Sequence, residues 1–413
     1  MSGQRPSMPN GDSVSDLVLV LNCGSSSIKY QLLHADSSEV LASGLAEKIG
    51  ESHGGRIVHE CGDRKLVHEG VIADHRAGLR QAFEMFRDTG IDLTTIGIGA
   101  VGHRVVHGGE VFWEPTLITD EVLRTIDELS VLAPLHNPAN VVGIESTREL
   151  LPGIPEVAVF DTAFFHTLPE AAKTYAIDAK LAAAHGVRKY GFHGTSHQYV
   201  SAKAAEFLGR PVEELNQIVF HLGNGASASA VAGGVAIDTT MGLTPLEGLV
   251  MGTRPGDLDP GILPHLMNVA GLDLPAVEQL LNRNSGIKGL SGVNDFRELQ
   301  QLIDNGDAAA KLAYDVYIHR LRRYLGAYLV ELGGIDSIVF TAGVGENSAS
   351  VRADALAGLQ NLGIEVDPVR NETRTPGVRH ISPEFAPVHV LVVPTNEELA
   401  IARAAHALVG GSA

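Results

Sequence analysis

The sequence predicts an α/β protein made of two related domains. An apolar run, a short polar turn and a second apolar run occupy residues 17–33, and the same order recurs at residues 217–237. Stretches with the period of helices lie between and after these two segments. A repeated plan of strand, turn and strand, interleaved with helices, indicates two α/β domains that face each other and hold a nucleotide between them.

The first strands follow from apolar runs that end in polar turns. Residues 17–21 and 28–33 are apolar and flank the turn at residues 22–27. In the second half of the chain, residues 217–222 lead into a glycine-rich turn at residues 223–228. Short apolar runs bounded by glycine, serine and asparagine are typical of strands joined by tight turns.

The later part of the chain continues the alternation of strands and helices. Residues 308–332 are predicted to form a long helix, because leucine and valine recur there at helical spacing. A strand that begins at Ile338 runs into the glycine-rich loop 343–347, and a last strand at residues 388–394 leads into a final helix. In open α/β sheets, ligands bind at strand ends of this kind.

The composition excludes several classes of protein. The chain of 413 residues has 49 acidic and 31 basic side chains, and its net charge of −18 argues against nucleic acid as a partner. Its two cysteines, Cys23 and Cys61, cannot build a disulfide framework and suit the cytoplasm. No stretch reads as a membrane-spanning helix, and residues 1–15 lack the features of a secretory signal and are predicted to be a flexible tail.

Two matches to known site patterns do not fit their surroundings. Residues 97–102 match the dinucleotide fingerprint G-x-G-x-x-G, but the residues that follow, up to Pro115, predict strand and turn where the fingerprint needs a helix. His193 and His197 have a spacing that could bind zinc on a helix, but the neighbouring glycines argue against a helix there. The chain has no Gly-Lys pair, which excludes the P-loop.

Three polar segments have the residues of a phosphate or nucleotide site. Asn22 and the serines after it can surround an anion with amides and hydroxyls, and Lys29 can balance its charge; a hairpin with a surface lysine is the simpler alternative. Residues 221–225 repeat this arrangement, with glycines that let the backbone approach a phosphate closely. Residues 343–347 would likewise let the backbone approach the nucleoside end of a nucleotide.

Charged side chains beside apolar strands supply the other parts of a phosphoryl-transfer site. Arg104 and Arg254 lie in apolar, glycine-rich segments, where a guanidinium can bind a carboxylate or a phosphate through two hydrogen bonds; a buried ion pair is the alternative. Asp161 ends a predicted strand, where it can act in catalysis or cap the next turn. Glu397 and Glu398 lie in the first turn of the last helix, and Glu397 can reach a magnesium ion at the strand end.

These segments, taken together, resemble the acetate kinase family, which is part of the superfamily of acetate and sugar kinases, Hsc70 and actin. The resemblance extends from about residue 17 to the last helix. It implies two duplicated actin-like (ribonuclease H-like) domains with mixed sheets flanked by helices, and a nucleotide and a substrate in the interdomain cleft. The domains would be residues 16–160 with 396–413, and residues 161–395. The motifs are residues 21–29, 102–109, 159–164, 190–197, 221–225, 238–260, 343–347 and 394–398.

The resemblance also implies roles for individual residues. Asp161 would be the catalytic carboxylate, while His193 and Arg254 would stabilise the equatorial oxygens of the phosphoryl group in transfer. Asn22 and Glu397 would serve Mg²⁺, for which Mn²⁺ could substitute. The residues implied for ATP and ADP are Lys29, His221, Leu222, Gly223, Asn224, Gly225, Asp295, Phe296, Arg297, Gly343, Val344, Gly345, Glu346 and Asn347.

For the acid, the resemblance implies contact with Arg104, which would also be catalytic, and a small apolar pocket around the acyl methyl group. Relatives that prefer propionate tend to have a smaller residue at the position of Val106, so acetate is the predicted substrate. One methylene in a pocket is worth only about 1–3 kcal/mol, so the preference over propionate should be modest. The pocket residues are Val106, Leu135, Phe192 and Pro245.

The predicted activity is reversible, Mg²⁺-dependent phosphoryl transfer between ATP and acetate, giving acetyl phosphate and ADP by direct in-line transfer in a cytoplasmic homodimer. Two alternatives stay open: a kinase for propionate or butyrate, and a non-catalytic actin-like nucleotide sensor. The presence of Arg104, Asp161, His193 and Arg254 together argues against the sensor.

Overall fold

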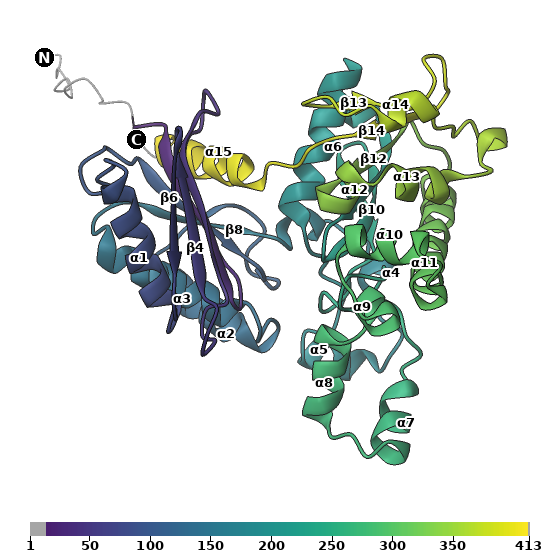
Figure 1. The fold of residues 1–413 in the computed structure, drawn as a ribbon, viewed down its shortest axis with the longest axis horizontal. Coiled ribbons are helices and arrows are strands. Elements are labelled where there is room, and N and C mark those ends of the chain that lie inside the picture. Colours follow the sequence, from purple (N-terminus) through teal and green to yellow (C-terminus); the bar gives the residue numbers. More distant parts are fainter. Residues whose placement is uncertain (1–13, 412–413) are drawn as a thin grey trace, which may run out of the picture. The chain divides into compact units, whose positions relative to one another are not determined.

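The computed structural model describes residues 14–411, so the predicted tail at residues 1–15 lies almost entirely outside the described residues. The chain divides into two compact units, both drawn in Figure 1. Unit 1 comprises Met1–Ala163 and Glu397–Ala413, and unit 2 comprises Phe164–Asn396.

The boundary between the units places Asp161 in unit 1, whereas the sequence analysis placed it at the start of the second domain. Its backbone N–H donates to the carbonyl of Val105 at 3.0 Å, and its side chain pairs with Arg104. Both partners belong to unit 1. Asp161 therefore completes the strand end that precedes it.

Unit 1 is built on an eight-stranded sheet in the order β5-β4-β3-β2-β1-β6-β8-β7. The pairs β1·β6 and β6·β8 are parallel and the others are antiparallel. The strands are β1 Leu17–Cys23, β2 Ser27–His34, β3 Val40–Glu47, β4 Arg56–Cys61, β5 Arg64–Glu69, β6 Ala100–Val105, β7 Thr116–Leu117 and β8 Glu156–Phe160.

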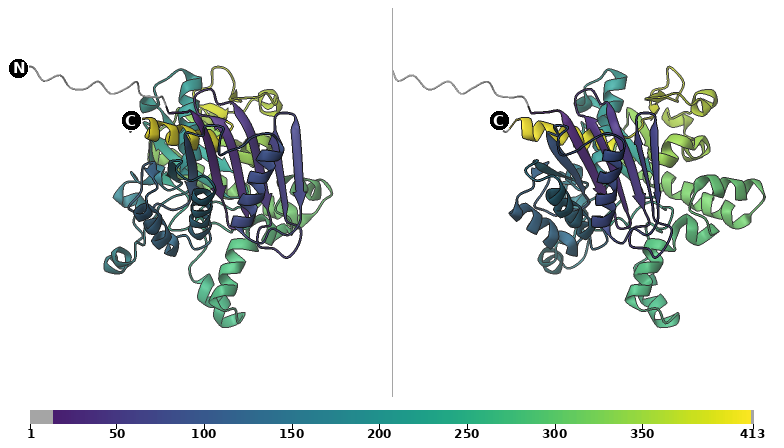
Figure 2. Two further views of the ribbon diagram at one scale, coloured as in Figure 1. Left: turned by 90° about the vertical axis from the view of Figure 1, so that its left-hand side faces the viewer. Right: turned by 60° about the vertical axis from the view of Figure 1, so that its left-hand side comes forward.

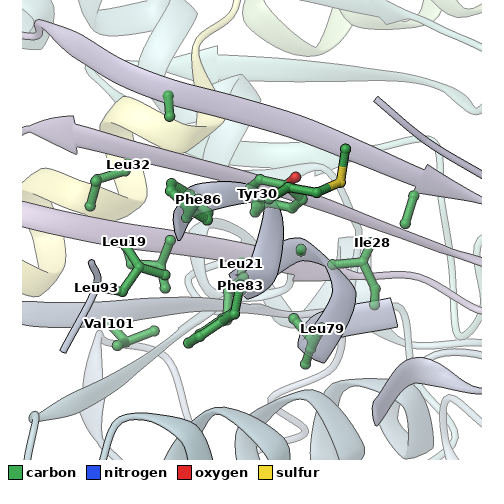
Figure 3. Packing of buried hydrophobic residues seen from close by; sticks show 14 of the residues in the cluster. Leu19, Leu21, Ile28, Tyr30, Leu32, Leu79, Phe83, Phe86, Leu93 and Val101 are labelled. Carbon is green, nitrogen blue, oxygen red and sulfur yellow. The ribbon is translucent and has the colours of Figure 1, made fainter. Parts of the chain in front are cut away.

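Strand β1 has apolar side chains on both faces because helices cover the sheet on both sides. Its odd-numbered leucines, beginning at Leu17, pack into a core with α1 (Figure 3). Val18 and Val20 point to the opposite face and pack with α15. The helices of unit 1 are α1 His75–Asp88, α2 Asp120–Glu128, the 3₁₀ turn η1 Leu129–Val131, α3 Asn137–Leu150 and α15 Glu397–Gly410. A further 3₁₀ turn, η2 Ala163–Phe165, begins at the last residue of the first segment of unit 1.

Unit 2 has a six-stranded sheet in the order β11-β10-β9-β12-β14-β13. The pairs β9·β12 and β12·β14 are parallel and the others are antiparallel. The strands are β9 Asn216–Leu222, β10 Ala226–Ala232, β11 Val235–Thr239, β12 Ser337–Thr341, β13 Arg379–His380 and β14 His389–Val392.

The helices of unit 2 include the predicted long helix, α11, which begins after Asp307 and ends at Gly333. The Asp307 carboxylate accepts from two backbone N–H groups of the first turn, and Gly333 adopts the left-handed conformation that ends many helices. Helices α7 and α8 project from the rest of unit 2 (Figure 2). The helical segments are α4 Glu170–Lys173, α5 Ala179–Ala184, α6 Gly194–Leu208, η3 Val212–Glu214, α7 Ile262–Val269, α8 Leu274–Arg283, α9 Gly286–Ser291, α10 Phe296–Asp304, α11 Ala308–Leu332, α12 Ala342–Asn347, α13 Ala349–Leu356, η4 Gln360–Leu362 and α14 Pro368–Glu372.

The two sheets repeat one topology, which confirms the predicted duplication and the α/β fold class. In unit 1 the strands β3-β2-β1-β6-β8-β7 lie in the same order as β11-β10-β9-β12-β14-β13 in unit 2. Along each series the pairs are antiparallel, antiparallel, parallel, parallel and antiparallel. The two hairpins repeated in the sequence are β1 with β2 and β9 with β10, and each belongs to the antiparallel part of a mixed sheet.

Two further expectations can be compared with the fold. The rejected dinucleotide match at residues 97–102 runs into strand β6, Ala100–Val105, so a strand follows it as predicted and no helix begins there. Residues 343–347, expected to be a loop, lie within the short helix α12. None of the helices in residues 14–411 combines the length and apolar character needed to cross a bilayer.

Candidate active site

In unit 1, three of the predicted residues come from the carboxyl ends of neighbouring parallel strands. Asn22 lies near the end of β1, Arg104 near the end of β6, and Asp161 directly follows β8. The register pairs Leu21 with His103 across β1·β6 and Arg104 with Val159 across β6·β8. Parallel strands end at the same edge of a sheet, so these side chains meet although 57 residues separate Arg104 from Asp161.

Arg104 is held by two hydrogen bonds to the Asp161 carboxylate. Its Nε donates to Oδ1 at 3.0 Å, and its NH2 donates to Oδ2. Asp161 is fully buried, and the Arg104 side chain is 17% exposed. Burial alone lowers the pKa of Arg104, but Asp161 and Glu397 outweigh this and raise the pKa above its ordinary value. The guanidinium is therefore a permanent cation in a fixed orientation.

Asn22 and Glu397 converge on the same guanidinium, and their oxygens fit a magnesium ion. Arg104 donates to Asn22 Oδ1 at 3.1 Å, and its Nε lies 3.8 Å from Glu397 Oε2. Mg²⁺ is usually held by one or two such oxygens, with water and phosphate supplying the rest. Burial raises the pKa of Glu397, which Arg104 only partly offsets, so a cation beside it would favour the ionised carboxylate. Among the described residues, no cluster of three or more His, Cys, Asp or Glu side chains offers an alternative metal site.

Lys29, predicted for the nucleotide, lies on β2 of unit 1 and pairs with Glu398 at 2.5 Å. The other residues predicted for the nucleotide belong to unit 2. Both Glu397 and Glu398 occupy the first turn of α15, as the sequence indicated. Glu398 is thus paired with Lys29, and its charge also acts on Arg104 and Glu397.

In unit 2, Arg254 and His193 point to the same backbone position, Gly225. A Cβ atom built on Gly225 would lie 2.6 Å from an Arg254 terminal nitrogen and 3.3 Å from His193 Nε2. A Cβ at this position would push the end of the Arg254 side chain aside and crowd the His193 ring, so glycine lets both groups lie close to the backbone. The turn between β9 and β10 thus brings a backbone edge, a guanidinium and an imidazole together.

Arg254 differs from Arg104 in having no carboxylate partner among the described residues 14–411. Its NH1 donates to the carbonyl of Pro245 at 2.7 Å. Burial lowers its pKa to about 10, which still leaves the side chain charged at neutral pH. The positive charge of Arg254 is therefore not neutralised by a carboxylate of unit 2.

His193 is held by a buried network of hydroxyls and imidazoles. Its Nδ1 and the Nε2 of His197 both hydrogen-bond to Ser227 Oγ, at 2.9 and 2.7 Å. His197 Nδ1 bonds to Ser229, and the His193 ring stacks on His221 with centroids 4.3 Å apart. His193 has a left-handed backbone, φ +60°, a strained conformation of the kind that gathers at functional sites.

The structure corrects one argument about these histidines. The sequence analysis held that no helix fits the glycines around them, but α6 begins at Gly194, with His193 as its N-terminal cap. Glycine is acceptable at the first helical residue, because the turn before it must leave the helical conformation. The nitrogens that a helical zinc site would use instead meet at the Ser227 hydroxyl.

A cavity of about 920 Å³ in unit 2 collects most of the residues predicted for the nucleotide. Three glycine-rich or polar turns form it, and the aromatic side chains of Phe296 and Tyr314 contribute to its wall. A pocket of this size, with a few polar groups and aromatic faces, suits a nucleotide. The predicted residues that line it are Gly223, Asn224, Asp295, Phe296, Arg297, Gly343, Val344 and Asn347.

Other predicted residues lie behind this cavity. Leu222 is fully buried, and Glu346 turns its carboxylate to the backbone N–H groups of Ala342 and Thr395, at 3.0 and 3.3 Å. His221, Gly225 and Gly345 are likewise not among the lining residues. They support the turns rather than line the space.

The cavity also has lining residues that the sequence analysis missed. Gly252 lies in the 238–260 motif, and Asn294 and Ser348 directly adjoin segments that were predicted for the nucleotide. Others, such as Gln300, Tyr314 and Glu372, stand in segments with no such motif, so the sequence pattern gave no signal for them. The missed residues are Gly252, Asn294, Leu299, Gln300, Gln301, Tyr314, Ser348, Ala349, Ser350, Glu372 and Arg374.

The four predicted acyl-pocket residues divide between the units. Val106 and Leu135 belong to unit 1, and Phe192 and Pro245 to unit 2. Val106 follows β6 two residues after Arg104, and its N–H donates to Asn140 Oδ1 at 3.1 Å. Pro245 is bound to Arg254 through its carbonyl. Each half of the predicted pocket thus adjoins one of the two arginines.

Comparison with known proteins identifies the family of the chain. The model of the acetokinase family matches residues 17–403. The chain belongs to the acetokinase family. An acetate kinase of Corynebacterium efficiens is 57% identical over 391 residues, which cover 94% of this chain and 98% of that protein. Members of the family are phosphotransferases with a carboxyl group as acceptor.

Solved structures of the family have the same fold. The acetate kinase of Porphyromonas gingivalis superposes with a TM-score of 0.89 at 44% identity, covering 95% of this chain and 99% of that one. A propionate kinase of Francisella tularensis gives a TM-score of 0.88 at 41% identity, covering 94% and 98%. Similarity of fold alone therefore does not separate acetate from propionate.

Proposed function

We propose that this protein transfers a phosphoryl group reversibly between ATP and acetate, giving acetyl phosphate and ADP. The observation that carries the proposal is the convergence of Arg254 and His193 on Gly225, with the Arg254 charge not neutralised by a carboxylate. A phosphoryl group in transfer carries charge on its equatorial oxygens, which cationic and N–H donors in fixed positions stabilise. The membership in the acetokinase family supports the same reaction.

For the nucleotide, we assign ATP and ADP to the cavity of unit 2. The adenosine would occupy the space lined by residues 294–297, at the start of α10, and by residues 343–350, in α12 and the start of α13. The phosphates would extend along Gly223, Asn224 and Gly225 towards Arg254, since glycine lets the backbone come close to phosphate.

For the metal, we assign Mg²⁺ to Asn22 and Glu397, with Mn²⁺ as a substitute. When bound, the ion would neutralise part of the phosphate charge. Arg104 lies within reach of both oxygens, so the chain's own part is to hold these ligands beside a fixed cation.

For the acid, we assign the carboxylate to Arg104 and the methyl group to Val106, Leu135, Phe192 and Pro245. Model carboxyl groups have a pKa of about 4, so acetate is ionised at neutral pH. Its oxygen can therefore attack the γ-phosphorus directly while the bond from that phosphorus to the bridging oxygen breaks and ADP leaves. No proton has to be removed, so we assign Asp161 the task of orienting Arg104 through its two hydrogen bonds.

A kinase for propionate or butyrate is the first alternative. The similarity to the Francisella tularensis propionate kinase is consistent with it, because similarity of fold does not separate the two acids. The side chain at Val106 supports acetate, because a larger wall leaves less room for a second methylene.

The test is a hydroxylamine trap for acyl phosphate, run with ATP, Mg²⁺ and acetate, propionate or butyrate in parallel. The proposal predicts the highest kcat/KM with acetate and a clear signal with propionate. A maximum at propionate would support the alternative kinase. The absence of any acyl phosphate with all three acids would leave a nucleotide sensor, which would still bind ATP.

We also propose that the protein is a cytoplasmic homodimer. The resemblance to the family and the presence of only two cysteines support this assignment. Analytical ultracentrifugation at several concentrations tests the dimer, and a monomer at micromolar concentration would contradict it.

A further inference from the structure

The segment between β11 and α7 carries two of the proposed active-site residues but has no helix or strand of its own. It runs from the end of β11 at Thr239 to the start of α7 at Ile262. Pro245 and Arg254 lie in it and are joined by the hydrogen bond from Arg254 NH1 to the Pro245 carbonyl at 2.7 Å. A connection of this length without secondary structure is uncommon in a compact domain, so its geometry must be fixed by contacts from outside.

The segment is pinched between Gly248 and Asp257, and we call this place the neck. The Asp257 N–H donates to the Gly248 carbonyl at 3.1 Å, and the Gly248 N–H donates to Asp257 Oδ1 at 2.8 Å. Gly248 has φ +102°, and a Cβ there would lie 2.5 Å from the Thr240 carbonyl oxygen. The two ends of the loop that carries Arg254 are thus fastened to each other.

Helix α11 holds the neck from outside through two side chains. Arg320 NH1 donates to the Gly248 carbonyl at 2.6 Å, and NH2 donates to the Asp257 carbonyl at 3.2 Å. The Tyr324 hydroxyl lies 3.0 Å from both carboxylate oxygens of Asp257. Burial and the Asp257 charge raise the pKa of Tyr324 above its ordinary value, so its hydroxyl keeps the proton that it donates.

The far end of the loop has separate anchors. The first turn of α9 donates to it from Ile287 N–H to the Met251 carbonyl and from Lys288 N–H to the Gly252 carbonyl, both at 2.9 Å. Loss of the contacts from α11 would therefore loosen the neck while the loop stays attached. The expected effect is a displacement of Arg254, not the unfolding of unit 2.

We propose that Arg320 and Tyr324 are positioning residues that fix Arg254 and Pro245 through the neck at Gly248 and Asp257. The inference rests on the proposed function, because the role of Arg254 in phosphoryl transfer comes from there. Neither residue is placed at the substrate. We call the contacts of Arg320 and Tyr324 with the neck the clamp. The clamp sets the positions of Arg254, the proposed transition-state cation, and of Pro245, one wall of the proposed acyl pocket.

Kinetics of Arg320→Gln and Tyr324→Phe test this inference. A displacement of about 1 Å in a reacting group can cost about 10²-fold in rate. We expect kcat with acetate to fall by about 10²-fold in Arg320→Gln and by about tenfold in Tyr324→Phe. The KM for ATP should change by less than about twofold, because the adenosine end of the proposed site lies on other turns. The ratio of propionate to acetate kcat/KM should rise a few-fold, since the Pro245 wall loosens.

Two residues of α11 provide matched controls. Tyr328→Phe removes the same atom from the neighbouring ring, whose hydroxyl makes no hydrogen bond within the described residues. Arg322→Gln removes a guanidinium that also binds backbone carbonyls, but those of Asp354, Ala355 and Ala357. Both controls should keep kcat within about twofold, and the thermal stability of each variant is measured beside its kcat so that a loss of folded protein is told apart from a displaced Arg254. Arg320→Lys, which keeps a charged donor, should recover part of the lost kcat.

The outcomes separate the two proposals. If wild-type protein forms no acyl phosphate with any acid, the proposed function is wrong, and the clamp falls with it. If wild-type protein is active and Tyr324→Phe and Arg320→Gln match their controls in kcat, the clamp is overturned while the function stands. If Arg320→Gln does not fold, Tyr324→Phe, which loses a single oxygen atom, decides alone.

Discussion

The two units each contain one proposed active-site arginine, and the surroundings of the two differ. Arg104 in unit 1 lies among carboxylates: Asp161 binds it through two hydrogen bonds and Glu397 is 3.8 Å away. Arg254 in unit 2 lies among neutral groups, with the Pro245 carbonyl as its hydrogen-bond acceptor and His193 facing the same glycine. Arg104, near the end of a strand of unit 1, thus lies beside carboxylates, whereas Arg254, in a loop of unit 2, does not.

The difference suggests separate tasks for the two arginines. A guanidinium that is already paired is fixed in direction and suits the orientation of a carboxylate substrate. A guanidinium without a carboxylate partner retains its charge for an anion that arrives later, as the developing charge of a phosphoryl transfer requires.

The largest predicted effect is the loss of turnover in Arg254→Ala. Removal of one such donor from a transition state costs about 10²–10³-fold in kcat, and the loss of a full charge should fall at the upper end. The hydroxylamine trap measures turnover, and calorimetry with ATP measures binding, which should change little.

Arg254→Lys is the matched variant, since it keeps the charge and loses the planar donor pair. It should recover part of the rate. A loss of less than tenfold in Arg254→Ala would contradict the proposed role of Arg254.

The second prediction concerns stability and separates the arginines directly. Arg104→Gln leaves the buried carboxylate of Asp161 without its cation, which should lower the free energy of unfolding of unit 1 by about 3–5 kcal/mol. Arg254→Gln leaves no carboxylate behind and should change stability much less. Trp113, the single tryptophan of the chain, belongs to unit 1, so its fluorescence in urea follows that unit. Equal changes in the two variants would remove the proposed distinction.

The third prediction concerns how firmly the strand end beyond Arg104 is held. His107 is fully buried, accepts from the Gly109 N–H at 2.9 Å, and has a pKa that burial lowers from 6.5 to about 4. The unfolded chain takes up this proton near pH 6.5 and the folded chain only near pH 4, so stability falls as the pH falls through this window.

The expected loss is about 3 kcal/mol across the window. His107→Asn should show a shallower decrease of stability between pH 6.5 and 4 in the same tryptophan assay. An unchanged slope would show that His107 is protonated as easily in the folded chain as in the unfolded one.

The smallest predicted effect concerns Cys23, beside Asn22. Burial raises the pKa of its thiol to about 12, which leaves almost no reactive thiolate at neutral pH. A maleimide should therefore label Cys61, which is only partly buried, with little effect on activity. Labelling of Cys23 at a comparable rate would show that the Asn22 turn opens in solution.

Much of the fold could be predicted from the sequence because local patterns determine it. The leucines and valines of β1 and β9 allowed only buried strands, and the helical spacing in α11 matched its observed bounds. The glycines around His193 misled the prediction, because glycine in a helix interior is unfavourable while glycine at a helix start is not.

The contacts within the site were beyond the sequence because they depend on strand order. Arg104 and Asp161 are adjacent only because β6 and β8 pair in parallel, and no local pattern records which strands pair. The bridge of Ser227 between two histidines likewise joins α6 to β10 across 34 residues. Glu372 and Arg374 line the cavity from a segment with no motif at all.

The central claim is that the phosphoryl group passes directly from ATP to the acid between positioned cations, and that no residue of the chain carries it. The most direct test uses ATP with a chirally labelled γ-phosphorus and acetate, followed by analysis of the configuration in acetyl phosphate. A single in-line displacement predicts inversion at phosphorus. Retention would mean two displacements through a phosphorylated residue, and would contradict the account.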